Sequence, residues 1–288
     1  MRDSKVYKQG WNLDDIDWAQ FDASKVAPWM LTAIKAAALV EFNAPDYVTY
    51  LKRVFKDGGP EILSDIEQWG REEGQHGATL GRWAELADPN FKLDEAFARF
   101  RKGYRPAHFA KTEEASVRGS RRGEMIARCV VESGTSSYYT AIRDATDEPV
   151  LKEIAGRIAA DEFRHYKLFY ETLHKQAEPE LSSWRKLRIA VGRMSESGDD
   201  ELAYAYYCAS VPAEREASTP YVRAAYAKAG YKTTLRLFRR RHIGKLTQMV
   251  AKAVGANPHG RITKLAEGLL WRMLRLRAGL AGVRAEAA

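Results

Sequence analysis

The chain has 288 residues, of which 45% are hydrophobic and 29% charged, a composition typical of a globular protein that can bury a core. No apolar run approaches the ~18 residues that a spanning helix needs, and the first residues lack the apolar stretch of a signal peptide. Two isolated cysteines, Cys129 and Cys208, exclude a disulfide framework, a CxxC pair and a zinc ribbon. We therefore expect a cytoplasmic protein.

The net charge of +8 is unevenly distributed along the chain. Residues 223–288 contain 15 Lys and Arg against two acids, a net of +13, whereas the other 31 Lys and Arg and 36 Asp and Glu leave residues 1–222 at −5. A basic C-terminal region on a mildly acidic body favours an anionic partner for that region.

Helical periodicity dominates the sequence, and strand signals are nearly absent. In chain order we predict helices over residues 24–42, 46–56, 61–87, 93–101, 119–145 and 149–176. Pro60 and Pro149 mark two of the starts. Further helices follow, with breaks expected near Gly198, Pro212, Pro220, Gly230 and Asn257-Pro258. The predicted organisation is an N-terminal arm (1–23), a four-helix unit (24–178) and a basic helical extension (179–288) that packs on the unit or extends from it.

Two of the long predicted helices contain the motif Glu-x-x-His. The first motif consists of Glu73 and His76, and the second of Glu162 and His165. Three residues are close to one helical turn, so the two side chains of each motif point to the same side of their helix. Carboxylate-bridged di-iron bundles combine two such turns with one Glu from each of two further helices.

Glu41 and Glu132 are the candidates for the other two ligands. Glu41 lies 32 residues before Glu73, and Glu132 lies 30 residues before Glu162. Near-equal spacing is typical of two antiparallel helix pairs related by a pseudo-twofold axis. Carboxylate and imidazole ligands suit iron or manganese better than zinc.

A third Glu-x-x-His, formed by Glu171 and His174, tests how specific the motif is. Glu171 follows Glu162 by nine residues, or two and a half turns, so it lies on the opposite side of the same helix. Its neighbours on that side are mostly polar. We therefore expect Glu171 and His174 to be surface residues.

The six candidate ligands, in contrast, lie on the apolar faces of their helices. On the helix 61–87 that face consists of Ile62, Ile66, Trp69, Leu80 and Trp83. Buried charges are costly unless they are paired or bind a metal ion. The alternative is that the helix faces are misjudged and these residues form surface ion pairs.

The segments that carry these ligands, LVEFNAPDYVTYL, REEGQHGATL, VVESGT and AADEFRHYKLF, resemble the soluble acyl-ACP desaturases and their relatives in the ferritin-like superfamily. The similarity covers roughly residues 30–175. It implies an all-α fold, a ferritin-like four-helix bundle with additional C-terminal helices. It also implies two bound iron ions, with manganese an option at one site, and O2 as co-substrate.

The resemblance implies roles for two further residues. Thr135 matches a position thought to help deliver protons during O2 activation, although a helix-packing hydroxyl explains it equally well. Asp161 matches a residue that hydrogen-bonds a ligand histidine, here His76. The chain departs from the family in its shorter length, in the turn at Ala44-Pro45 and in the tail after residue 180, where no match extends.

The expected function is an O2-dependent di-iron oxidoreductase of the desaturase or monooxygenase type, acting on an acyl- or lipid-like substrate. The chain has no flavin, haem or iron–sulfur motif, so electrons are expected from a ferredoxin-like protein or a reductase, and relatives suggest a homodimer. An apolar channel beside the metals would suit such a substrate. Its candidate lining is Trp69, Trp83, Phe163, Phe169 and Tyr139, although aromatic residues at helical spacing are more often plain core.

Three other functions remain open. One is peroxide reduction or iron handling as in rubrerythrins and ferritins, although the chain has no rubredoxin-type cysteines. The second is hydroxylation or N-oxygenation of a non-lipid substrate; N-oxygenating members use an extra histidine, for which His242 and His259 are available. The third is a scaffold without metal, which the complete ligand set disfavours.

Residues 235–241 and 269–277 mix arginines with leucines and aromatic residues. That composition fits an amphipathic helix at an anionic membrane surface, which would make the protein peripheral, and equally a docking surface for acyl carrier protein. A solvated basic face on helices that cap the bundle is the third interpretation. Nucleic acid is not favoured, because no base-reading element accompanies the charge.

Overall fold

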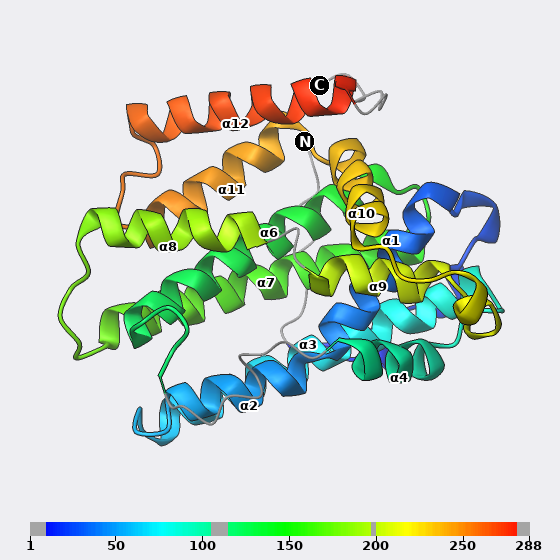
Figure 1. Cartoon of the computed structure of the whole chain (residues 1–288), viewed down its shortest axis with the longest axis horizontal. Coiled ribbons are helices and arrows are strands. Elements are labelled where there is room, and N and C mark those ends of the chain that lie inside the picture. Colours follow the sequence, from blue (N-terminus) through cyan, green and yellow to red (C-terminus); the bar gives the residue numbers. More distant parts are fainter. Residues whose placement is uncertain (1–9, 105–114, 197–199, 281–288) are drawn as a thin grey trace.

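The computed structural model describes residues 10–104, 115–196 and 200–280. Within these ranges the chain is all-helical and contains no β-strand, as the helical periodicity of the sequence predicts (Figure 1). Its α-helices are α1 (Pro28–Phe42), α2 (Ala44–Val54), α3 (Pro60–Ala87), α4 (Leu93–Gly103), α6 (Arg121–Ala145), α7 (Pro149–Lys175), α8 (Ser183–Ser195), α9 (Asp200–Ser210), α10 (Arg223–Leu237), α11 (Arg240–Ala253) and α12 (Arg261–Leu280). Short 3-10 helices are Leu13–Asp15, Trp18–Gln20, Ala23–Lys25 and Ala213–Ser218.

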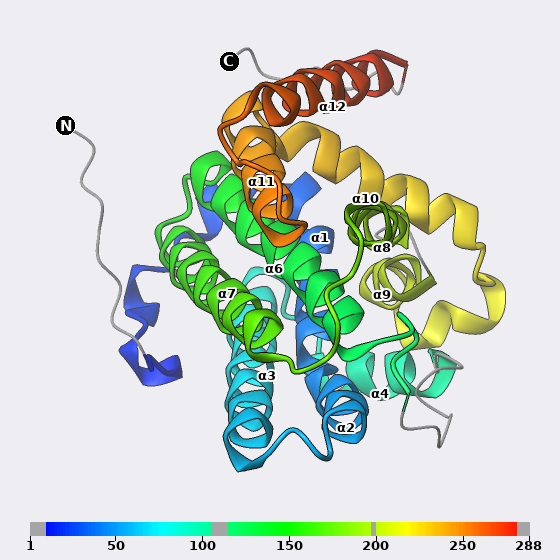
Figure 2. The ribbon, with the colours of Figure 1, turned by 90° about the vertical axis from the view of Figure 1, so that its left-hand side faces the viewer.

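The centre of the molecule is built from α1, α3, α6 and α7. Helix α1 packs along α3, α6 packs along α7, and α3 contacts α7 (Figure 2). Standard capping fixes the starts of α6 and α7. The Ser120 hydroxyl accepts from the Gly123 N–H at 3.0 Å, and the Glu148 carboxylate accepts from the Leu151 N–H at 2.7 Å. Pro149 supplies the first residue of α7, where no N–H is needed.

Two hydrophobic clusters lie at different levels along these helices. One contains Leu80 and Trp83 from the second half of α3 and Ile154 from the first half of α7. The other contains Ile66 from the first half of α3 and Phe169 from the second half of α7. This pattern fits antiparallel α3 and α7, and it leaves the middle of both helices, where the Glu-x-x-His motifs lie, between two apolar layers.

Helices α1 and α3 approach each other closely at Gly77. A Cβ atom at this position would lie 2.4 Å from the backbone nitrogen of Phe42 and 2.7 Å from its Cα. Only glycine therefore allows this approach. The contact brings the end of α1, with Glu41, against the middle of α3, with His76.

The C-terminal helices pack on the central four. Helices α8 and α11 contact α6, α9 and α10 contact α1, and α12 lies across α11 at the edge of the molecule (Figure 1). Pro212, Pro220 and Asn257-Pro258 fall between helices, as the sequence predicts, and Gly198 lies outside the described residues.

The break predicted near Gly230 is wrong. Helix α10 runs through this position without interruption. A Cβ atom there would lie 3.0 Å from the ring of Tyr206, so Gly230 allows α10 to pack against α9. The glycine is explained by close packing and does not end the helix.

The described part of the N-terminal segment packs against the central helices. Trp11 and Ile16 are buried, and the Gln75 amide on α3 donates to the Trp11 carbonyl at 2.7 Å. Trp11 also stacks on the ring of His76, with the ring centres 6.0 Å apart. The segment therefore contributes directly to the surroundings of the predicted metal ligands.

None of the helices in the described ranges is both long enough and apolar enough to cross a membrane.

Candidate metal centre

The structure brings the six predicted ligands together from four helices. Helix α1 supplies one carboxylate, α3 a carboxylate and an imidazole, α6 one carboxylate, and α7 a carboxylate and an imidazole. All six side chains are buried: Glu41, Glu73, His76, Glu132, Glu162 and His165.

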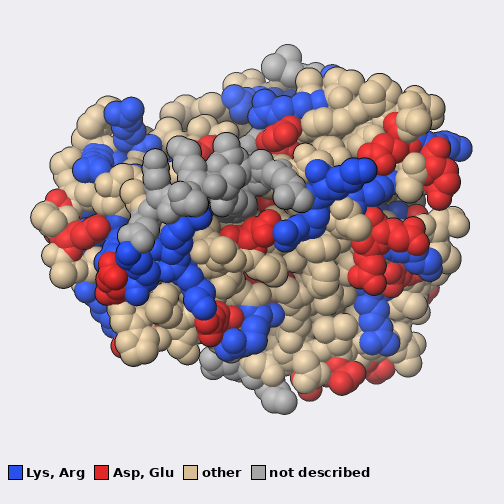
Figure 3. All heavy atoms as spheres, turned by 60° about the horizontal axis from the view of Figure 1, so that its bottom comes forward, with Lys and Arg blue, Asp and Glu red and all other residues tan. Residues whose placement is uncertain are grey.

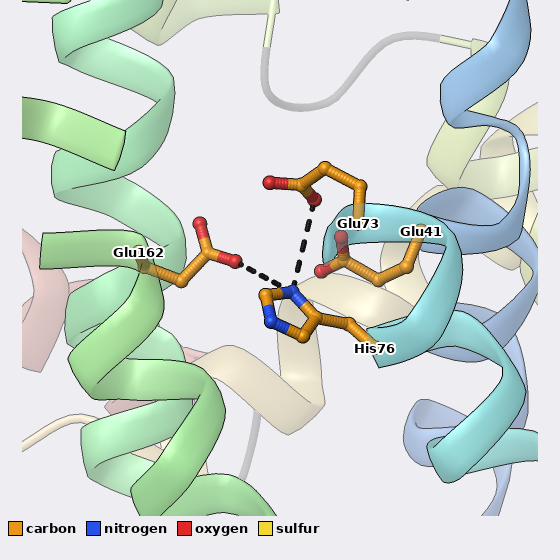
Figure 4. Close-up of side chains that lie close together, drawn as sticks. All are labelled: Glu41, Glu73, His76 and Glu162. Carbon is orange, nitrogen blue, oxygen red and sulfur yellow. Dashed lines mark ion pairs between the residues drawn. The ribbon is translucent and has the colours of Figure 1, made fainter. Parts of the chain in front are cut away.

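The ligand atoms form two groups that share two carboxylates. Glu41 and His76 belong to the first group, shown in Figure 4, and Glu132 and His165 to the second. Glu73 and Glu162 belong to both. Within each group the ligand atoms lie no more than 4.8 Å apart, so each group can hold one metal ion, and the shared carboxylates can bridge the two ions.

Both histidines turn Nδ1 toward the carboxylates. His76 Nδ1 lies 3.2 Å from Glu162 Oε1 and 4.0 Å from Glu73 Oε2 (Figure 4). His165 Nδ1 lies 2.9 Å from Glu73 Oε1 and 3.9 Å from Glu132 Oε2.

Several atoms at the centre of this cluster make no hydrogen bond of good geometry within the described part of the chain. They are Glu73 Oε1, His76 Nδ1, Glu132 Oε1, Glu162 Oε1 and His165 Nδ1. Contacts such as the 2.9 Å between His165 and Glu73 are close in distance but poorly directed for a proton. Unsatisfied buried polar atoms are costly, so a set of them facing one centre fits metal ions as the missing partners.

Burial and neighbouring charges shift the pKa values of the residues in the cluster. Burial, followed by the neighbouring carboxylates, raises the pKa of Glu41 and of Glu132 well above the usual range. Burial opposes protonation of His165, but Glu72 and Glu73 outweigh it and raise its pKa to about 9. Without metal the cluster therefore retains protons that balance its negative charge, and bound cations would replace them.

Asp161 occupies the position expected from the sequence. Its Oδ2 lies 2.9 Å from His76 Nε2 and also accepts from the indole N–H of Trp11 at 2.8 Å. Arg164 forms an ion pair with its other oxygen. A carboxylate at Nε2 keeps the proton on that nitrogen and leaves Nδ1 free for a metal ion.

Glu72 does the same for the second histidine. Its Oε2 lies 2.7 Å from His165 Nε2. This role of Glu72 was not predicted from the sequence, although a signal was present. In both motifs an acid directly precedes the ligand glutamate, Glu72 before Glu73 and Asp161 before Glu162. Each of these acids contacts the histidine of the other motif: Asp161 contacts His76, and Glu72 contacts His165.

Two hydroxyl groups contact the ligand carboxylates. The Thr135 hydroxyl donates to Glu162 Oε2 and lies 3.3 Å from the backbone oxygens of Val131 and Glu132. The Tyr139 hydroxyl donates to Glu41 Oε1. Thr135 thus contacts a candidate ligand carboxylate, and the proton-delivery role that the resemblance implies for it stays a prediction. Tyr139 was predicted only as an apolar wall, because the sequence does not show where its hydroxyl points.

The remaining polar candidates lie away from the cluster. Glu171 and His174 are exposed, as predicted. His242 Nε2 lies 3.0 Å from Asp144 Oδ2, and His259 is exposed. Neither His242 nor His259 provides the extra ligand that the N-oxygenase interpretation requires.

The residues proposed to line a substrate channel are mostly packed core. Trp69 and Phe169 contact each other edge to face, and the Trp83 indole donates to Glu148 at 2.7 Å. Phe163 is partly exposed and lies beneath Lys245. A cavity of about 10 Å³ lies between α3, α6 and α7, which is room for one water molecule. These side chains therefore fill space beside the cluster.

Comparisons with known proteins give no identification. No protein-family model matches the chain. No curated protein matches it with significance.

Proposed function

We propose that the chain is a ferritin-like di-iron protein that uses O2 to oxidise an apolar substrate, as a desaturase or a monooxygenase. The observation that carries the proposal is the pair of four-ligand groups that share Glu73 and Glu162. A single structural metal ion would not need two groups, and a network of surface ion pairs would not be buried between two apolar layers.

The donor set supports iron. Each group combines three carboxylates with one imidazole, and no thiolate lies among the ligands. Oxygen-rich sites with imidazole suit ferrous iron or manganese, whereas structural zinc sites favour cysteine and histidine. Two ferrous ions would bring four positive charges to a cluster that has four carboxylates, so its charge would be balanced.

Bound ferrous ions would supply the electrons that reduce O2 and create the oxidising power for an unactivated C–H bond. The protein's own part follows from its contacts. Asp161 and Glu72 hold the two imidazoles with Nδ1 turned inward. The Thr135 hydroxyl can pass a proton at Glu162, and the two apolar layers limit access of water.

A separate electron donor is part of the proposal. Cys129 and Cys208 are both buried and distant in sequence, and neither forms a redox pair. A ferredoxin-like protein or a reductase would deliver the two electrons of each turnover. An acyl group or another lipid-like molecule is the proposed substrate, in keeping with the apolar surroundings of the cluster.

Peroxide reduction or iron oxidation is the second candidate. The packing of Trp69, Phe169 and Trp83 beside the cluster favours it, because O2, peroxide and ferrous iron need far less space than an acyl chain. The two candidates share the metal site and differ in the molecule that is oxidised.

Metal analysis combined with O2 consumption tests the proposal. The chain should bind two irons when loaded anaerobically, and the ferrous protein should consume O2. Glu73→Ala and Glu162→Ala should each lose most of the iron and the O2 consumption, because each removes a ligand shared by both groups. Faster oxidation by peroxide than by O2 would favour the second candidate.

Glu171→Ala is the matched control. It removes a glutamate from the same helix and from the same Glu-x-x-His pattern, but on the exposed side. Its iron content and O2 consumption should equal those of the unaltered chain. If Glu171→Ala lost iron, or if Glu162→Ala kept it, the face of α7 that we propose to bind metal would be wrong.

A further inference from the structure

Helix α12 presents an apolar stripe to solvent. Five side chains spaced by three or four residues along the helix are between 41% and 81% exposed: Ile262, Leu265, Leu269, Met273 and Leu276. At 1.5 Å per residue the stripe is about 21 Å long. Isolated exposed leucines are ordinary, but a continuous apolar stripe on one helix indicates a surface that another phase or molecule covers.

The opposite side of the helix attaches it to the protein. Leu270, Trp271 and Leu274 pack against the core, and Ala278 is buried. The Thr263 hydroxyl donates to the Asn257 carbonyl at 2.7 Å at the start of the helix. Helix α12 is therefore docked through one face, and the apolar stripe lies on the other.

The charges beside the stripe are basic. Arg261, Lys264, Arg272 and Arg275 are exposed and fall on one flank of the stripe by helical spacing, and Arg277 falls on the other. The single acid within α12, Glu267, lies 3.4 Å from Arg240 of α11 and so faces the protein. By contrast, acidic and basic side chains are interspersed on the surface around α2 and α4 (Figure 3).

We propose that α12 binds the surface of an anionic lipid membrane, with its apolar stripe inserted among the acyl chains and its arginines at the phosphates. An exposed apolar stripe flanked by Lys and Arg is the pattern of helices that lie in the plane of a membrane interface. The position of α12 at the edge of the molecule leaves it free to lie flat on such a surface (Figure 1).

The charge pattern favours lipid over a second copy of the chain. Two α12 helices packed through their stripes would bring basic flanks together, and among the described residues of α12 no acid lies on that face to pair with them. An anionic lipid surface supplies negative charge and an apolar interior in one partner. The binding would place the metal cluster of the proposed function beside a source of lipid, although the inference does not depend on bound metal.

Co-sedimentation of the full chain with vesicles tests the inference. The chain should bind vesicles that contain phosphatidylglycerol, bind phosphatidylcholine vesicles far more weakly, and lose affinity as salt is raised. Leu265→Gln/Leu269→Gln should weaken binding by tenfold or more, because it removes two apolar side chains from the stripe. Lys264→Gln/Arg272→Gln should weaken binding to anionic vesicles by a similar factor.

Lys92→Gln/Lys102→Gln at the two ends of α4 is the control, since it makes the same change in net charge at exposed positions far along the chain; Lys92 directly precedes the helix and Lys102 lies in its last turn. It should bind like the unaltered chain, and all variants should keep the unaltered far-UV circular dichroism. The proposal would be overturned if the chain did not bind vesicles, or if the α4 control lost as much binding as the α12 variants. It would also be overturned if the chain bound a soluble acidic protein but not the vesicles. A dimer that only the α12 substitutions dissociate, without vesicle binding, would likewise overturn it.

Discussion

Each histidine of the cluster is held at Nε2 and presents Nδ1 to the candidate ligand carboxylates. Nδ1 faces the ligand carboxylates, and Nε2 contacts an acid on the neighbouring helix, Asp161 for His76 and Glu72 for His165. Asp161 lies on α7 and contacts the histidine of the α3 motif, and Glu72 lies on α3 and contacts the histidine of the α7 motif. The arrangement therefore ties α3 to α7 through the ligands themselves.

Glu72→Gln should weaken metal binding by about 10–100-fold with little change in the fold. The amide keeps the shape of the side chain but removes the charge that holds the His165 proton on Nε2. Asp161→Asn should act in the same way through His76. Ferrous titration monitored by metal analysis measures the change.

Glu67→Gln is the control for these variants. Glu67 lies on the same helix, pairs with Lys52 and is partly exposed. Its metal affinity should be unaltered. If Glu72→Gln bound metal as tightly as the unaltered chain, Glu72 would not support metal binding through His165.

The residues of the site differ in how far the sequence reveals them. The six candidate ligands could be picked out from the sequence, because motif spacing and apolar helix faces are local properties. Trp11 could not, because its hydrogen bond to Asp161 joins residues 150 positions apart. Tyr139 could not either, since its helical position predicts burial and leaves the direction of its hydroxyl undetermined.

At the scale of elements, Gly77 controls how closely α1 and α3 approach beside the ligands. Gly77→Ala should lower the free energy of unfolding by about 1–3 kcal/mol, because its Cβ would clash with the Phe42 backbone. It should also lower metal affinity, since Glu41 directly precedes Phe42. Chemical denaturation and ferrous titration measure the two effects.

Gly74→Ala provides the contrast. A Cβ at Gly74 meets no atom within 4 Å, and alanine is the better helix former by up to about 1 kcal/mol. This variant should be as stable as the unaltered chain or more stable. If Gly74→Ala lowered the free energy of unfolding more than Gly77→Ala does, the packing described for α1 and α3 would be contradicted.

Helix α11 is fastened to the end of α6 through Asp144. Its carboxylate lies 2.6 Å from Arg241 Nη2 and 3.0 Å from His242 Nε2. Burial opposes ionisation, but hydrogen bonds from His242, Arg241 and Arg143 outweigh it and hold the pKa of Asp144 well below its usual range. The ionised carboxylate is therefore the form that the folded chain stabilises.

The pH dependence follows from this lowered pKa. The contribution of Asp144 to stability is fully present above about pH 4, the pKa of an unfolded Asp, and is lost as the pH falls toward the lower folded value. Asp144→Asn should therefore destabilise the chain at pH 7 and make a smaller difference at pH 3. Urea denaturation of the unaltered chain and the variant at pH 7 and at pH 3 measures the difference in free energy of unfolding. A difference that is larger at pH 3 would contradict the role of Asp144.

The positions of most helices in the sequence were predictable, whereas the way in which the helices pack against one another was not. Proline and asparagine marked most helix ends correctly because they act on the local backbone. Gly230 misled the prediction because its reason is contact with Tyr206 on another helix. The same limit applies to the packing of α8–α12, which local periodicity does not specify.

For the whole molecule, bound metal should raise thermal stability. An ion that binds only the folded chain contributes about 4 kcal/mol at a concentration one thousand times its Kd. At about 2 °C per kcal/mol for a chain of this size, the Tm should rise by roughly 8 °C for each ion. Anaerobic calorimetry with and without ferrous iron measures the rise, and Glu162→Ala should abolish most of it.

If the chain binds two metal ions in one buried cluster, the ions share Glu73 and Glu162. Crystals of the iron-loaded chain, with anomalous diffraction recorded at the iron edge, would locate them. We expect two peaks about 3.5–4 Å apart, one toward Glu41 and His76 and the other toward Glu132 and His165. A single peak, or peaks only outside this cluster, would contradict this expectation.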